Sequence, residues 1–180
     1  AADYADMTGA GALTNQAKLT AAVANLAEAL KVDLSKKIAA VDKTDKAALR
    51  TLADEIDAIN DVITEDLELD PSKKVDTTVV TKALQTIRDK ELAAVMATIN
   101  ALPVNITEAD KAAVEAARAA YDAFVEDWTE YNAFGDNDYN AAAKVTNFRT
   151  LALAEATLGL NNNPEENAKA YVQDLSIKAR

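Results

Sequence analysis

The segment from Ile106 to Trp128 constrains the fold most strongly, because its pattern of residues is that of an amphipathic α-helix. Its apolar residues recur at steps of three and four, which places them on one side of a helix: Val114, Ala117, Tyr121, Phe124 and Trp128. Thr107 is expected to cap this helix, and Asp110 adds negative charge to its first turn, where the helix dipole favours it. Arg118 and Asp122 fall on the opposite side, one helical turn apart and opposite in charge. The segment therefore predicts a helix and indicates no chemistry.

The same spacing recurs along most of the chain and predicts an all-α fold. Helices are expected over residues 13–41, from Asp42 to just before Asp70, from Thr77 or Thr78 to Pro103, over 141–160, and from Pro164 onward. No segment alternates well enough to predict a strand. The fold class that follows is an elongated bundle of about six helices, built from tandem helical hairpins.

The expected organisation has three parts. Residues 1–12 hold two of the four glycines and form an irregular lead-in. Residues 13–132 form two related helical pairs. Residues 133–180 form a C-terminal helical pair that packs on the same bundle.

The two helical pairs are related by an internal repeat. Thr44–Ile59 (TDKAALRTLADEIDAI) aligns with Ala109–Phe124 (ADKAAVEAARAAYDAF), and a long helical segment precedes each copy. Apolar residues coincide at three pairs of positions, 49 with 114, 56 with 121 and 59 with 124. Duplication explains this pattern, and convergence of alanine-rich helix starts is the alternative. Repeated helical units bury their apolar stripes against their neighbours, which favours an elongated arrangement.

Charge and composition exclude several classes of function. The formal net charge is −11, so nucleic acid and anionic lipid are poor partners for this surface. The chain has no cysteine and no histidine, which removes thiol nucleophiles, imidazole bases and Cys/His metal sites. No apolar run approaches the roughly 18 residues that a membrane-spanning helix needs. Membrane insertion is therefore not expected.

A short acidic segment after Gly135 is the one candidate metal site. Asp136, Asp138 and Asn140 have the spacing of the first three ligands of an EF-hand calcium loop. The sixth and twelfth positions of such a loop need glycine and glutamate, whereas this chain has Ala141 and Asn147 there. A polar turn is the favoured interpretation, calcium is the alternative, and no other cofactor is expected.

Acidic residues elsewhere do not predict a catalytic site. An acidic stripe recurs at helical spacing and is interpreted as a solvated surface, with cation binding as the alternative: Asp54, Asp57, Asp61, Glu65 and Glu68. Paired carboxylates can hydrolyse glycosides, but the substrate clefts of such enzymes are rich in aromatic residues, which make up only 5% of this chain. We therefore expect a protein that is not an enzyme.

The segment INALPVNITEADKAAVEAARAAYDAF resembles a helical repeat of S-layer-type and cell-wall surface proteins of Gram-positive bacteria. The residues that match the repeat are Ala101-Leu102-Pro103, Ile106-Thr107, Asp110-Lys111 and Ala112 to Ala123. Phe124 replaces the leucine that is usual in the family, and the sequence that follows departs from the family pattern. The resemblance implies a non-catalytic spacer or structural module outside the cell.

The function expected from this resemblance is structural: a module of a secreted bacterial surface protein, S-layer-like or wall-associated. Its partners would be other copies of itself or neighbouring surface-protein domains, with cell-wall polymer as a further candidate. Two alternatives stay open. One is a helical module that binds a host or cell-wall ligand, and the other is a small secreted hydrolase that uses carboxylates alone.

We predict that calcium changes the thermal stability of the chain no more than magnesium does at equal ionic strength. The reason is the incomplete ligand set of the loop at Asp136, Asp138 and Asn140. Differential scanning fluorimetry with each cation measures this. A saturable rise in melting temperature with calcium alone, abolished by the double substitution Asp136→Ala and Asp138→Ala, would instead establish the site.

Overall fold

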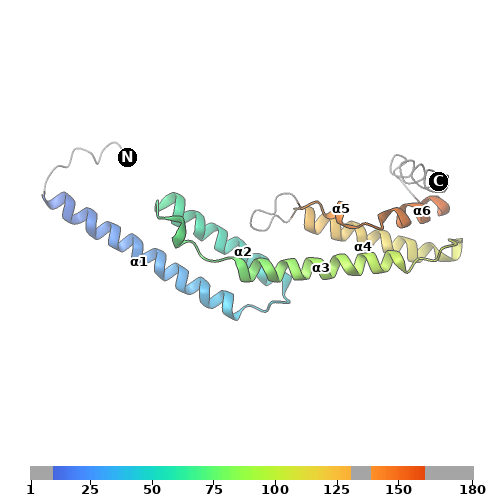
Figure 1. Cartoon of the computed structure of the whole chain (residues 1–180), viewed down its shortest axis with the longest axis horizontal. Coiled ribbons are helices and arrows are strands. Elements are labelled where there is room, and N and C mark those ends of the chain that lie inside the picture. The colour runs from blue at the N-terminus through green and yellow to red at the C-terminus, as the bar shows by residue number, and fades with distance from the viewer. Residues whose placement is uncertain (1–9, 131–138, 161–180) are drawn as a thin grey trace. The chain divides into compact units, whose positions relative to one another are not determined.

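The computed structural model describes residues 10–130 and 139–160, and within these ranges it contains six α-helices and no strand (Figure 1). The helices are α1 (Ala10–Ala40), α2 (Lys46–Asp61), α3 (Thr78–Asn100), α4 (Lys111–Glu130), α5 (Ala141–Lys144) and α6 (Phe148–Leu158). This confirms the predicted all-α class. The elongation of the whole chain stays a prediction.

The chain divides into two compact units, an N-terminal unit Ala1–Leu84 and a C-terminal unit Gln85–Arg180. Helix α3 begins in the N-terminal unit and continues in the C-terminal unit. Asp136 and Asp138 of the candidate loop, and the helix expected from Pro164 onward, lie outside the described residues.

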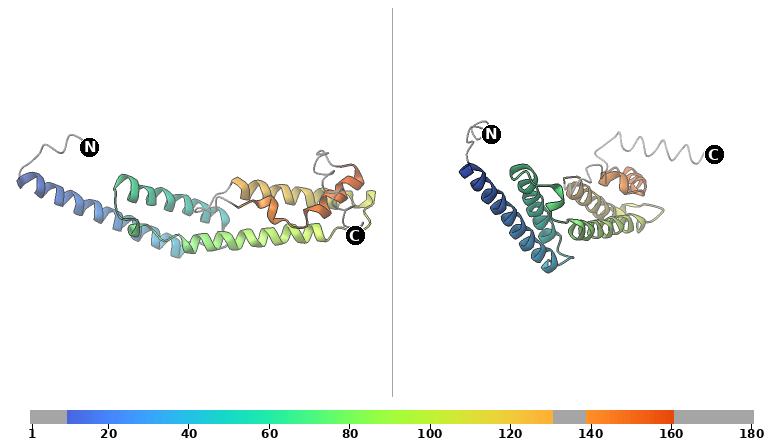
Figure 2. Two further views of the ribbon diagram at one scale, coloured as in Figure 1. Left: turned by 45° about the horizontal axis from the view of Figure 1, so that its top comes forward. Right: turned by 60° about the vertical axis from the view of Figure 1, so that its left-hand side comes forward.

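In the N-terminal unit, α1 and α2 form an antiparallel hairpin (Figures 1 and 2). Helix α1 starts at Ala10, so the last three residues of the expected lead-in are helical. The hairpin buries aliphatic side chains that recur at helical spacing: Ala27, Leu34, Leu49, Leu52, Ala53 and Ile56. The apolar face of α2 therefore lies against α1 around Ala27 and Leu34.

The start of α2 differs from the sequence-based prediction, because Asp45 caps this helix and Asp42 does not. The Asp45 carboxylate accepts a hydrogen bond from the backbone N–H of Ala48 at 2.9 Å. Asp42 instead accepts hydrogen bonds from the backbone N–H and the hydroxyl of Thr44, at 2.8 and 2.7 Å. These two bonds stabilise the carboxylate and lower the pKa of Asp42 below its ordinary value. The short turn that they form sets the entry into the helix three residues later.

The end of α2 is irregular and is held by Asn60. After Asp61 the helix widens into a π-helical turn, Val62–Asp66, and Glu68 then adopts a left-handed conformation with φ 49°. The buried Asn60 side chain binds both backbone polar groups of Val75: its Oδ1 accepts from the N–H at 2.7 Å and its Nδ2 donates to the C=O at 3.3 Å. Asn60 thus closes the connection between α2 and α3 and satisfies backbone groups that are buried away from water. As predicted, the helix ends before Asp70-Pro71.

In the C-terminal unit, α4 lies beside α3 and is covered by α5 and α6 (Figures 1 and 2). The predicted cap is confirmed: Thr107 precedes a short 3₁₀ turn, and its backbone N–H and hydroxyl donate to Asp110 Oδ2 at 2.9 and 2.8 Å. The core of this unit contains the predicted stripe of α4 together with side chains from α3, α5 and α6. Its α4 members are Val114, Ala117, Phe124 and Trp128.

The prediction of a single helix over residues 141–160 is wrong. These residues form two helices, α5 and α6, separated by a turn at Val145–Asn147. Asn147 explains the break, because its Nδ2 donates to Met96 O at 2.8 Å and to Asn100 Oδ1 at 2.9 Å, both at the end of α3. Gly159 ends α6 in a left-handed conformation, φ 63°, which glycine adopts readily at the end of a helix.

The two copies of the proposed repeat bury matching positions. Leu49 in α2 and Val114 in α4 are both fully buried, and Leu52 and Ala117 are buried one turn later. The starts of the copies differ, because Asp45 caps α2 whereas Asp110, its counterpart, bonds back to Thr107. The common apolar stripe is what duplication predicts, and common ancestry stays a hypothesis.

We predict that Asn60→Ala destabilises the chain by about 2–4 kcal/mol, because it leaves the buried N–H and C=O of Val75 without partners. Urea unfolding followed by circular dichroism measures this change. Asn105→Ala is the matched control, since Asn105 is exposed in the turn between α3 and α4. Equal midpoints for the two variants would contradict the role assigned to Asn60.

Candidate functional site

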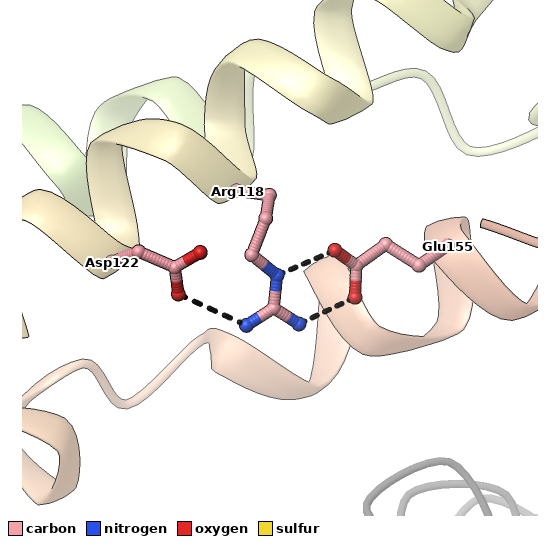
Figure 3. Close-up of polar contacts among 3 residues, drawn as sticks. All are labelled: Arg118, Asp122 and Glu155. Atoms are coloured by element: carbon pink, nitrogen blue, oxygen red, sulfur yellow. Dashed lines mark hydrogen bonds and ion pairs between the residues drawn. The ribbon is translucent and has the colours of Figure 1, made fainter. Parts of the chain in front are cut away.

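A cluster of charged and aromatic side chains surrounds Arg118 of α4. Arg118 Nε donates to Glu155 Oε1 and one terminal nitrogen donates to Glu155 Oε2, each at 2.5 Å (Figure 3). The other terminal nitrogen lies 3.4 Å from Asp122 Oδ1, one turn further along α4. Glu155 is on α6, so this two-point contact joins the two helices side chain to side chain.

Burial makes this ion pair different from a surface pair. The Glu155 side chain is 5% exposed and that of Arg118 is 25% exposed, whereas Asp122 is 59% exposed. The hydrogen bonds that Arg118 donates to Glu155 raise the pKa of its guanidinium above its ordinary value. A two-point contact between guanidinium and carboxylate is strong and directional, so it fixes how α6 lies along α4.

Two aromatic rings complete the surroundings of Arg118. Tyr121 and Phe148 lie with ring centroids 4.5 Å apart and planes tilted by 34°. The central guanidinium carbon of Arg118 lies 5.3 Å from the Tyr121 centroid and 5.2 Å from that of Phe148. A cation at this distance from ring faces is attracted by them, which adds to the ion pair.

The chemistry open to this cluster is limited by its own contacts. Both carboxylate oxygens of Glu155 accept hydrogen bonds from the Arg118 guanidinium, so they are engaged within the fold. Arg118 in turn faces Glu155 and Asp122 of its own chain, which leaves its charge compensated. The geometry is that of a structural clamp between helices.

A second polar link in the same unit satisfies Trp128. The buried Trp128 indole N–H donates to Glu91 Oε2 of α3 at 2.6 Å. The indole N–H of a buried tryptophan usually needs a hydrogen-bond partner, and Glu91 supplies it here. Trp128 therefore belongs to the core together with the rest of the α4 stripe.

Of the predicted metal ligands, only Asn140 lies within the described residues. Its Oδ1 accepts from the backbone N–H of Ala143 at 3.0 Å, so Asn140 caps α5. Among residues 10–130 and 139–160, no group of three or more acidic side chains could hold a metal ion. The interpretation of Asp136, Asp138 and Asn140 as a polar turn, with calcium binding as the alternative, stays a prediction.

The predicted acidic stripe of α2 and the following turn is exposed at all five positions, Asp54, Asp57, Asp61, Glu65 and Glu68. Neighbouring Glu55 differs, since it forms a close ion pair with Lys37 of α1, which also lies 3.3 Å from Asp33. The hydrogen bond to Glu55 raises the pKa of Lys37 above its ordinary value. The stripe itself therefore forms a solvated acidic face, as the favoured interpretation expected.

Sequence reasoning missed the pair of Arg118 with Glu155. Arg118 was placed on the solvent side of α4 and paired only with Asp122, and that contact is confirmed at 3.4 Å. The available signal was Glu155 itself, a charged residue within the otherwise apolar run of α6, LALAEATL. A lone acid in such a run needs a basic partner, but spacing along the chain does not identify that partner.

No protein-family model, curated protein or solved structure matches this chain. The helices of the described ranges include none that is long and apolar enough to cross a membrane.

We predict that Glu155→Gln destabilises the chain by about 3 kcal/mol, because it leaves the partly buried Arg118 charge without its main partner. Asp122→Asn is the matched control and should cost roughly 0–1 kcal/mol, as expected for an exposed pair. Thermal and urea unfolding measure both changes.

Removing both charges of the Arg118–Glu155 pair is a second test of its structural role, because it should restore stability. The double substitution Arg118→Met and Glu155→Leu should recover most of the stability that Glu155→Gln loses, since an apolar pair leaves no buried charge. Equal losses for Glu155→Gln and Asp122→Asn would overturn the clamp role.

Proposed function

We propose that this chain is a non-enzymatic structural module of a secreted bacterial cell-surface protein, S-layer-like or wall-associated. The observation that carries the proposal is the resemblance of ITEADKAAVEAARAAYDAF, at Ile106–Phe124, to the helical repeats of such proteins. On this proposal the chain acts outside the cell through its shape and its contacts with copies of itself or with neighbouring surface-protein domains.

The place of the matched residues in the fold supports this proposal. Val114 and Ala117 are buried in the core of the C-terminal unit, and Arg118 clamps α4 to α6. The matched segment thus supplies packing and internal polar contacts. A segment whose shared residues build the fold is what a structural repeat needs, whereas an enzyme family shares residues that line a site.

One observation favours a second candidate function, a helical module that captures a host or cell-wall ligand. The five exposed acidic side chains from Asp54 to Glu68 form a strongly charged face on one helix and its terminal turn. Such a face attracts cationic partners and would account for binding without catalysis.

Electron microscopy of the purified chain tests the structural function. We expect ordered arrays or filaments at moderate ionic strength and their loss at low salt, because the charge of −11 repels neighbouring copies when it is unscreened. Sedimentation at each salt concentration measures the assembled fraction.

The contrary outcome is a strict monomer up to roughly millimolar concentration, with or without salt or calcium. That result would reject assembly by this chain and favour the binding module.

A further inference from the structure

The segment that connects α2 to α3, residues 62–74, has two irregular backbone features. A π-helical turn, Val62–Asp66, follows the last α-helical residue of α2, and Glu68 then adopts φ 49°. π-helical turns are rare, and at positive φ the Cβ atom of a non-glycine residue crowds the backbone. Glu68 is the one non-glycine residue with positive φ in the described ranges. The segment is therefore held in a conformation that its own backbone disfavours.

The sequence of the same segment favours a different conformation, a longer α-helix. The apolar stripe of α2 continues in step through Ile59, Ile63 and Leu67. No glycine or proline interrupts residues 46–70. Local preference therefore supports α2 as far as Leu67, whereas the structure ends its α-helical part at Asp61. A disagreement between local preference and tertiary structure indicates that contacts from outside the segment impose its conformation.

The contact that imposes this conformation is the pair Asn60 and Val75, which we call the clasp. Asn60 immediately precedes the π-helical turn, and Val75 immediately follows residues 62–74. The Asn60 side chain binds the backbone N–H and C=O of Val75 at 2.7 and 3.3 Å, and both residues are buried. The clasp thus closes the segment at its two ends and shields these hydrogen bonds from water.

The segment itself contributes little to the core. Ile63 is fully buried, but no side chain from Glu68 to Lys74 is buried. The side chains that hold α1 against α2 lie outside the segment and include Leu34, Leu49 and Ile56. Parts of a protein with few buried apolar side chains open at a lower free energy than its core. The segment is therefore able to open while the α1–α2 hairpin stays folded.

We propose that residues 62–74 form a two-state conformational element. In its closed state the clasp holds the π-helical turn and the left-handed Glu68. In its open state the clasp is broken, Val75 is released, and α2 continues as an α-helix to Leu67. This element goes beyond the structural function proposed above and does not depend on it.

The acidic residues of the segment oppose the open state. In a continuous α-helix Asp61, Glu65 and Glu68 would follow one another at steps of four and three, on one face. Like charges at these spacings repel one another and disfavour the helix. In the closed state the left-handed Glu68 does not continue that helix. Removing an acidic charge at position 68 therefore favours the open state.

Native-state hydrogen exchange of the full chain, followed by NMR, tests the proposal. The reporters are the amides of Leu67 and Leu69, which donate to Val62 O and Ile63 O at 2.9 and 3.0 Å, and the amide of Val75. Relative to their intrinsic rates, they should exchange at least about tenfold faster than the amide of Ile56 within α2, and with one common opening free energy.

Two substitutions of Glu68 separate backbone strain from charge. Glu68→Gly removes the Cβ atom that crowds the backbone at φ 49°, so the reporters should exchange about threefold to fivefold more slowly. Glu68→Ala is the matched control, because it removes the same charge, keeps the Cβ atom and favours helix. Exchange of the reporters should become faster in this variant.

Asn60→Ala tests the clasp and the nature of the open state. The reporters should exchange faster relative to Ile56, a ratio that corrects for the loss of global stability in this variant. The Cα chemical shifts of residues 62–67 should move toward α-helical values.

Three results would overturn the proposal. One is exchange of the reporters with the same opening free energy as Ile56, which would mean that the segment opens only when the helices unfold. Another is an equal effect of Glu68→Gly and Glu68→Ala. The third is a shift of residues 62–67 toward random-coil values in Asn60→Ala, because the open state would then not be a longer α2.

Discussion

The fold depends on burying narrow stripes of small aliphatic side chains, because the helices are rich in alanine and poor in aromatic residues. An alanine-rich helix packs closely but gains little apolar burial per residue, so a stripe of Leu, Ile and Val must lie accurately against its partner. Leu34, Leu49 and Ile56 are fully buried in the N-terminal unit, and Ile99, Val114 and Leu151 in the C-terminal unit. Such stripes make helices associate but allow them to slide and rotate, since apolar contact is not directional.

Polar contacts within each unit fix how the packed helices are aligned along one another. In the C-terminal unit Arg118 binds Glu155, Trp128 binds Glu91, and Asn147 binds the end of α3. In the N-terminal unit Asn60 binds both backbone groups of Val75. Each contact has a defined direction, and each buried polar group without its partner costs free energy. Together they select one arrangement from the several that aliphatic stripes would tolerate.

The use of polar side chains for contacts within the fold also bears on function. The polar residues of the described ranges that bind other parts of the fold include Arg118, Asn60 and Asn147, whereas the acidic side chains from Asp54 to Glu68 are exposed. An exposed acidic face suits contacts with other molecules. The proposed module works through contacts, and the resemblance of Ile106–Phe124 to a structural repeat supports that proposal.

The sequence by itself determined the class of the fold, most of the helix limits and the composition of the core, because these follow from local spacing. Thr107 and Gly159 act at the helix ends where their residue types predict them, and the α4 stripe is buried as its period requires. Only the tertiary structure decided that α5 and α6 are separate, that Asp45 and not Asp42 caps α2, and that Glu155 pairs with Arg118. The physical reason is the distance along the chain over which each interaction acts. Periodicity and capping depend on neighbours within a helical turn. Asn147 and Glu155 instead bind residues that packing brings close from distant parts of the chain.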